Sequence, residues 1–255
     1  GVDIKSCHRY LVSELHASFT REGKYGGSFE NRTRLLRETL SRIRTEIPSV
    51  FITTRMSAYD AISYPYGFGV DKEDYRIPDL EEPIQLAGEL KNLHAPILNI
   101  SIGNPYYNPH FGRPFDFPIH GLSAPAEHPM AGLDRFVEIT GKIQESIPDV
   151  PVIASGYSWL RQFMPNVAAG VIRRGGATLI GVGRGAFAYP DTVRDLMETG
   201  RMDPGKCCVT CSACTQIMRD GAMTGCVVRD SKIYGPQYRL GRRFSIDRLR
   251  EEAKR

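Results

Sequence analysis

Short apolar segments alternate with amphipathic patterns along most of the chain, and this alternation constrains the fold more than any other feature. The expected strands are Val2–Lys5, Val50–Arg55, Ile97–Ile102, Val152–Ala154 and Thr178–Val182. Apolar side chains recur at steps of three and four, as in helices, at residues 29–46, 80–93, 131–147, 158–173 and 191–199. Apolar strands that alternate with amphipathic helices predict a parallel sheet covered by helices.

The pattern contains five β/α units, with Ser28 as the expected N-cap of the first long helix. A closed TIM (β/α)8 barrel needs eight strands and about 250 residues, so five units with long connections predict the C-terminal part of such a barrel. The chain begins at Gly1, without Met, and runs directly into an expected strand. We interpret it as the C-terminal piece of a longer protein. Residues 1–200 are expected to form the partial barrel, and residues 201–255 a Cys-rich segment with a basic tail.

Composition excludes several classes of protein. The net charge of +4 is small for 255 residues, and no apolar run approaches the roughly 18 residues of a membrane span. There is no signal-peptide pattern, and the cysteines lack a secreted disulfide pattern, so we expect a reducing, cytoplasmic compartment. Residues 201–255 carry 12 Lys and Arg against 6 Asp and Glu. These positive charges are scattered without interleaved aromatic residues, so we expect no nucleic-acid binding.

Four cysteines near the C-terminus, Cys208, Cys211, Cys214 and Cys226, form the run C-x2-C-x2-C-x11-C. Runs of this kind hold iron–sulfur clusters through four thiolates, and we expect a [4Fe–4S] cluster. Zinc sites more often pair two separated C-x-x-C knuckles, so zinc is the second interpretation. Free or redox-active thiols are the third. Cys207 stands beside the first expected ligand, and we interpret it as a non-ligand neighbour.

Ionisable side chains gather where two expected strands end. Lys5, His8 and Tyr10 lie within six residues at the end of the first strand, where the active sites of parallel barrels are built. A structural role for His8 remains the alternative. Arg55 closes the second expected strand, and a guanidinium there is costly unless it meets an anion. The anion would be a ligand or a neighbouring carboxylate.

Two later strand ends carry glycine. Gly156 follows the fourth expected strand, and Gly183 and Arg184 follow the fifth. Loops after the last two strands of a barrel commonly bind phosphate through backbone N–H groups, and an Arg fork can grip the same group. The loop between residues 103 and 129 holds three of the six His. We expect it to form a lid or pocket wall, with a crossover packed by its own aromatic residues as the alternative.

Three stretches resemble the old yellow enzyme family of flavin oxidoreductases. They are Lys5–Leu11, the Tyr-Gly-Gly-Ser-Phe-Glu-Asn-Arg stretch at Tyr25–Arg32, and Gly181–Pro190 followed by Asp191. Together with the cysteine run, they are most similar to the iron–sulfur branch, which includes 2,4-dienoyl-CoA reductase and trimethylamine dehydrogenase. The cysteine spacing is closer to that of trimethylamine dehydrogenase. The resemblance covers about residues 1–230, the later part of the family's barrel.

The resemblance implies roles for individual residues. Tyr10 matches the tyrosine that donates a proton to the substrate, and His8 matches one of the two residues that hold the substrate's carbonyl oxygen. Lys5 stands where the family has a histidine, which leaves a cation at that place. Arg55 matches the arginine beside the pyrimidine end of FMN. Matches to the FMN phosphate site are Gly156, Tyr157, Gly183 and Arg184. The histidine that the dienoyl reductase uses after its sixth strand is absent here unless His110 takes its place.

The resemblance therefore implies an FMN- and [4Fe–4S]-dependent oxidoreductase that reduces an activated C=C bond of a small-molecule substrate. NAD(P)H or a ferredoxin-like electron-transfer partner would be the donor, and the full-length protein is expected to form a homo-oligomer. An oxidative alternative is an amine dehydrogenase or demethylase that passes electrons out through the cluster. A third interpretation is an inactive fragment that completes its barrel only with an N-terminal partner, because an open sheet exposes its edges.

Overall fold

The computed structural model describes residues 1–116 and 124–252, and the side chains of residues 244–250 and 252 are outside this description. The chain forms two compact units, which we describe separately. The first consists of residues 1–114, 127–156 and 167–181. The second consists of residues 115–126, 157–166 and 182–255, so it includes segments from both sides of the boundary expected at residue 200.

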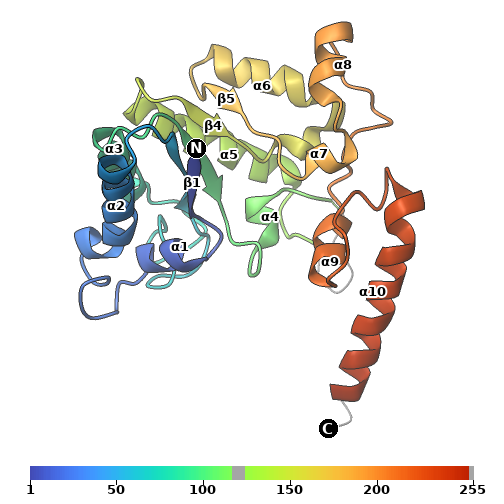
Figure 1. The fold of residues 1–255 in the computed structure, drawn as a ribbon, viewed down its shortest axis with the longest axis horizontal. Coiled ribbons are helices and arrows are strands. Elements are labelled where there is room, and N and C mark those ends of the chain that lie inside the picture. Colours follow the sequence, from blue (N-terminus) through green and yellow to red (C-terminus); the bar gives the residue numbers. More distant parts are fainter. Residues whose placement is uncertain (117–123, 253–255) are drawn as a thin grey trace. The chain divides into compact units, whose positions relative to one another are not determined.

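The first unit is built on one parallel sheet of five strands, ordered as they occur in the chain (Figure 1). The strands are β1 (Val2–Ser6), β2 (Ile52–Tyr59), β3 (Leu98–Ile102), β4 (Val152–Ala154) and β5 (Leu179–Ile180). Each strand pairs in parallel with the next along the chain. This sequential parallel order is the one expected for consecutive β/α units of a barrel.

Helices follow the strands of the first unit. They are α1 (Leu11–His16), α2 (Phe29–Glu46), α3 (Glu81–Asn92), α4 (Pro109–Gly112) and α5 (Pro129–Ser146). The Ser28 side chain caps α2 by accepting a hydrogen bond from the backbone N–H of Asn31. Helix α6 (Met164–Arg173) follows β4 after a 3-10 segment, η1 (Tyr157–Phe163). Helices α2 and α3 lie side by side and both contact β2 (Figure 1).

The core of the first unit lies between the sheet and its helices. In the first halves of β2 and β3 the buried residues alternate with more accessible ones: Met56 and Ile100 are fully buried, whereas Arg55 and Asn99 are only partly buried. Towards the ends of both strands every residue is buried. The helices contribute Leu36, Leu86 and Phe136, each at most 1% exposed. One face of the sheet is therefore apolar and covered, and its other face carries polar side chains.

The second unit is mainly helical within the described residues. It contains η1, α7 (Gly185–Ala188), α8 (Thr192–Thr199), α9 (Ala213–Arg219) and α10 (Ser231–Glu252). The four expected cysteine ligands flank and enter α9. No described helix of either unit combines the length and the apolar character that a membrane crossing needs.

The structure confirms the five expected strand–helix units and their parallel arrangement. The second strand was placed too early in the chain: it runs from Ile52 to Tyr59, so Arg55 lies in its middle and does not close it. The strand continues because Met56, Ser57, Ala58 and Tyr59 are buried against β3 and the helices. The expected loop at 103–129 contains α4, and its residues 117–123, with His120, lie outside the described part of the chain.

Candidate functional site

A row of polar residues crosses the first three strands. Lys5 on β1 is in register with Arg55 on β2, which is in register with Asn99 on β3. Residues in register on neighbouring parallel strands point to the same face of the sheet. Met56 and Ile100, one position further along, point to the opposite, buried face. The sheet thus presents an amine, a guanidinium and an amide together on its polar face.

The turn after β1 brings the three predicted catalytic residues to this face. The Lys5 Nζ atom lies 3.6 Å from the centre of the Tyr10 ring, within cation–π range. The Tyr10 hydroxyl is 2.7 Å from the Tyr106 hydroxyl. The His8 Nε2 atom is 3.0 Å from the Ser101 hydroxyl, which also lies 3.4 Å from an Arg55 guanidinium nitrogen. Lys5 and Tyr10 are therefore in direct contact, and Ser101 joins His8 to Arg55.

Sequence reasoning missed Ser101 and Tyr106. Both lie in or just after β3: Ser101 is the penultimate residue of the strand, and Tyr106 is in the loop that follows it. The concentration of aromatic residues in that loop was a usable signal for Tyr106. Ser101 had no local signal, because only the register between Ser57 and Ser101 brings it to the polar face.

Cys7 lies between the catalytic candidates but has a different character. Its side chain is fully buried, and burial raises the pKa of the thiol to about 11, against the opposing charges of Arg55 and Lys5. A thiol with this pKa stays protonated at neutral pH. Cys7 is therefore a packing residue, since nucleophilic cysteines need thiolate character.

His110, the alternative acid, lies in α4 with its ring 4.7 Å from that of Phe111. Burial lowers the pKa of His110, and the charges that act on it come from Glu127 and Arg135. Neutral imidazole is therefore favoured at neutral pH. Its charged neighbours come from α5 and the segment before it, and none is a predicted catalytic residue.

Two buried polar atoms of the row lack a partner among the described residues. They are Nε of Arg55 and Oδ1 of Asn99, a donor and an acceptor on adjacent strands. Buried polar groups are nearly always hydrogen-bonded in native proteins, so this donor and this acceptor are available to a bound ligand. The pyrimidine end of a flavin offers both N–H donors and carbonyl acceptors. The polar row therefore fits the part of FMN that the sequence predicted at Arg55.

The predicted phosphate residues are divided between the two units. Gly156 follows β4 in the first unit with a φ of +98°, and a Cβ there would meet the Phe136 ring at 2.7 Å, so only glycine fits. In the second unit, the buried Tyr157 hydroxyl has no described partner, and burial raises the pKa of Tyr157 to about 12. Space beside Gly183 is open. Arg184 donates to the hydroxyls of Ser212, at 3.2 Å, and Thr215.

The cysteine run lies in the second unit, with Cys214 9% exposed and the other three predicted ligands half-buried. Burial raises the pKa of the Cys211 thiol, and the charges of Cys208, Cys214 and Cys226 raise it further, while a backbone hydrogen bond from Ala213 opposes them. The four sulfurs are thus close enough to influence one another. No three metal-ligating side chains in the described part of the chain, however, converge into a metal-binding group. The cluster therefore stays a prediction.

The backbone around these sulfurs has features of a cluster site. The backbone N–H of Thr210 donates to Cys208 Sγ at 3.4 Å, and that of Arg229 donates to Cys226 Sγ at 3.3 Å. Thr210 and Ser212 are left-handed, with φ of 54° and 57°. A backbone in which residues of positive and negative φ alternate turns successive N–H groups toward one concavity, as in many iron–sulfur and phosphate sites. The donor chemistry thus fits a group with negatively charged sulfurs.

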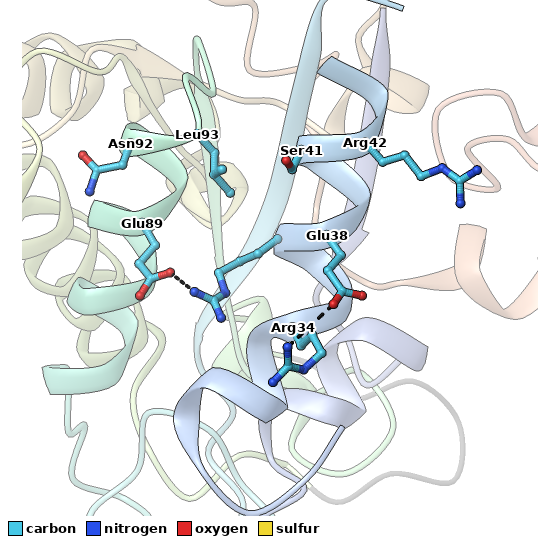
Figure 2. A pocket seen from close by; sticks show the side chains of 8 residues that line it. Arg34, Glu38, Ser41, Arg42, Glu89, Asn92 and Leu93 are labelled. Carbon is cyan, nitrogen blue, oxygen red and sulfur yellow. Dashed lines mark hydrogen bonds and ion pairs between the residues drawn. The ribbon is translucent and has the colours of Figure 1, made fainter. Parts of the chain in front are cut away.

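A groove of about 680 Å³ lies between α2 and α3 in the first unit (Figure 2). Arg37 and Glu89 form an ion pair across it. Arg34 and Glu38 form a second, longer pair at 3.7 Å along α2. None of the sequence-predicted site residues lines this groove. It is a solvated channel between two neighbouring helices whose charges are already paired.

Comparison with known proteins finds a family match in the first part of the chain. Residues 1–81, which carry Lys5, His8, Tyr10 and Arg55, match the model of the NADH:flavin oxidoreductase / NADH oxidase family. The first third of the chain is therefore similar to this family of flavin oxidoreductases, which confirms the resemblance that the sequence motifs predicted.

Two relatives and one solved structure illustrate the relationship. The chain is 27% identical over 216 residues to NADH oxidase of Thermoanaerobacter brockii, covering 83% of this chain and 28% of that protein. It is 25% identical over 242 residues to dimethylamine dehydrogenase of Hyphomicrobium, covering 94% and 29%. The old yellow enzyme homologue from Zymomonas mobilis superposes with a TM-score of 0.53 at 21% identity, covering 80% and 47%. The chain spans less than half the length of the curated relatives it matches.

Proposed function

We propose that this chain supplies the later strands of an FMN- and [4Fe–4S]-dependent oxidoreductase that reduces an activated C=C bond. NAD(P)H or a ferredoxin-like protein is the proposed electron donor. The observation that carries the proposal is the arrangement of Tyr10, whose ring lies against the Lys5 amine and whose hydroxyl contacts that of Tyr106. A proton donor next to a cation that can hold a carbonyl oxygen is the arrangement that ene reduction needs.

The chain's own residues account for the acid side of this reaction. Lys5 and His8 hold the carbonyl oxygen of an enone, enoate or enoyl thioester and draw electron density from its β-carbon. The Tyr10 hydroxyl delivers a proton to the α-carbon. The Tyr106 hydroxyl, 2.7 Å away and on an exposed residue, can return a proton to Tyr10 from solvent. When bound, FMN supplies the hydride chemistry.

Six residues are proposed to hold the flavin. Arg55 and Asn99 would satisfy the pyrimidine end with their unpaired polar atoms, and the charge of Arg55 favours an anionic ring. Gly156, Tyr157, Gly183 and Arg184 would take the phosphate. This assignment is supported by the unpaired Tyr157 hydroxyl and the open space at Gly183.

The proposed cluster ligands are Cys208, Cys211, Cys214 and Cys226. Support comes from their spacing in the sequence and from the backbone N–H groups that donate to two of the sulfurs. Hydrogen bonds to the sulfurs are among the features that set the potential of such clusters. When bound, the cluster exchanges single electrons.

The central test is Tyr10→Phe in the full-length protein. This change removes the phenolic proton and keeps the ring beneath Lys5. We expect kcat for ene reduction to fall by about 10²- to 10⁴-fold, the usual contribution of a general acid, with flavin still bound. Tyr107→Phe is the matched control, because Tyr107 is 64% exposed and lies in the loop after β3, next to Tyr106. Full activity in Tyr10→Phe would refute the assigned role.

Amine oxidation is the second candidate function. It is favoured by the spacing of the cysteine run and by the similarity to dimethylamine dehydrogenase over 94% of this chain. An anaerobic experiment separates the two candidates. Bleaching of the flavin by secondary or tertiary amines supports the oxidative function, whereas reoxidation of the reduced flavin by enones supports the reductive one.

A further inference from the structure

The turn that carries His8 and Tyr10 is held in an unusual backbone conformation. His8 and Arg9 are both left-handed, with φ of 62° and 57°, and neither is glycine. Left-handed conformations are unfavourable for residues with a Cβ, and two in succession persist only when surrounding contacts impose them. Some contact must therefore hold this turn in place.

The Arg9 side chain provides that contact. It is 14% exposed and lies between two carboxylates. One guanidinium nitrogen donates to Glu14 Oε2 at 2.6 Å, in the first turn of α1, and the other lies 3.5 Å from Asp60 Oδ2. Glu14 is half-exposed, whereas Asp60 is fully buried. Arg9 thus spans from the start of α1 to the residue that follows β2.

Asp60 is fixed on its own side. It accepts hydrogen bonds from the Ser57 hydroxyl at 2.8 Å and from the backbone N–H of Phe68 at 3.0 Å. Burial raises the pKa of Asp60, while the Phe68 N–H and the Arg9 charge oppose this effect. Ser57 is in register with Ser101, the partner of His8. These contacts therefore connect the turn after β1 to the ends of β2 and β3, where His8 contacts Ser101.

We propose that Arg9 and Asp60 are positioning residues that hold the strained turn so that His8 reaches Ser101 and Tyr10 reaches Tyr106. Neither side chain touches the reacting atoms in this arrangement. The Arg9 guanidinium acts by holding the turn in its conformation, and Asp60 acts by holding the Arg9 guanidinium in place. The inference rests on the proposed function, since His8 and Tyr10 are the groups that are positioned.

The critical variant is Arg9→Gly in the full-length protein. Glycine adopts the left-handed conformation without strain. Arg9→Gly therefore removes the guanidinium contacts, while its backbone can still adopt the observed turn. We expect the urea midpoint to fall modestly, because relief of the backbone strain offsets only part of the cost of leaving the buried Asp60 carboxylate without its cation. The kcat for ene reduction should fall by about ten- to a hundredfold with little change in KM, because small misplacements of acid groups have effects of this size.

Two further changes sharpen the test. Asp60→Asn removes the charge but keeps one oxygen, which can accept from the Phe68 N–H, while the Ser57 hydroxyl can turn to accept from the new NH2 group. It should lower kcat in the same way. The double variant should lose no more than the greater of the two single variants, because both act through one contact. Arg76→Ala is the control, since Arg76 is 70% exposed and pairs with Asp74 in a loop. Its kcat should match that of the wild type.

A structural readout separates this inference from the proposed function. The imidazole nitrogen signals of His8, assigned with His8→Gln, report its hydrogen bond to Ser101 without any turnover. Loss of that hydrogen bond in Arg9→Gly supports positioning even if the wild-type protein reduces no C=C bond. An unchanged His8 signal, unchanged kcat in Arg9→Gly, or independent losses in the double variant would overturn the inference.

Discussion

Replacing Arg32 should strongly destabilise the first unit, although Arg32 belongs to the stretch that most resembles the flavin enzymes. Its side chain is 2% exposed and lies in α2. Nε donates to the carbonyl of Gly27 at 2.9 Å, Nη1 to that of His16 at 2.5 Å, and Nη2 to the Glu82 carboxylate at 2.5 Å. The guanidinium also lies 3.8 Å from the centre of the Phe19 ring. Arg32 therefore joins α1, the loop before α2, and α3.

Arg32→Met keeps much of the side-chain volume and removes all three hydrogen bonds. Two backbone carbonyls and one partly buried carboxylate then lose their partner, and removal of one member of a buried pair costs about 3–5 kcal/mol. This is a large share of a typical unfolding free energy of about 5–15 kcal/mol. With a urea m-value of about 2.5 kcal/mol/M, a loss of about 4 kcal/mol lowers the midpoint by about 1.6 M.

The assay is urea unfolding of the full-length protein, followed by far-ultraviolet circular dichroism. Arg42→Met is the control, because Arg42 lies in the same helix and its ion pair with Glu46 is exposed on both sides. It should unfold at the wild-type midpoint. A loss below about 1 kcal/mol for Arg32→Met would refute the reasoning, since it would mean that the freed carbonyls are satisfied by water at no net cost.

Two predictions concern a histidine that titrates and the cysteines that are proposed to bind a cluster. Burial, together with the charge of Arg32, lowers the pKa of His16 to about 3, so the folded state keeps His16 neutral while the unfolded state takes up a proton below pH 6.5. His16 should therefore cost stability as the pH falls from about 6.5 toward 3, and His16→Gln should flatten that part of the curve of unfolding free energy against pH. An equal slope in both proteins would contradict this assignment. Cys214→Ser should abolish bound iron and acid-labile sulfide, whereas Cys207→Ser should leave both unchanged; iron retained in the first variant would remove Cys214 from the ligand set.

Much of the fold was predictable from local patterns. Residues 29–46 form a helix with the expected bounds and with Ser28 as its cap, because a long amphipathic period and a capping residue are both local signals. The strand at Val152–Ala154 was also predicted with its observed bounds. The short helices α1, α4, α7 and α9 were missed, since seven residues or fewer span too little of a helical period to stand out. Helix α10 was missed because Gly235, Pro236 and Gly241 interrupt its pattern.

The site was predictable only in part. Lys5, His8 and Tyr10 are close in the sequence, so their clustering needed no tertiary information. Their partners are remote: Ser101 and Tyr106 lie more than 90 residues further along the chain. Register between strands decides which of these side chains share a face, and register depends on packing of the whole sheet.

The sequence alone determined the parallel β/α architecture, the resemblance to flavin oxidoreductases, and the chemical types gathered at the first strand end, because periodicity and short motifs are local properties. Only the tertiary structure decided that Arg55 is an interior residue of β2 with an unpaired Nε beside Asn99. It also decided that Arg9 and Asp60 hold the turn in which His8 and Tyr10 lie. These facts depend on which distant residues are brought into contact and which are buried, and no local pattern of residues encodes them.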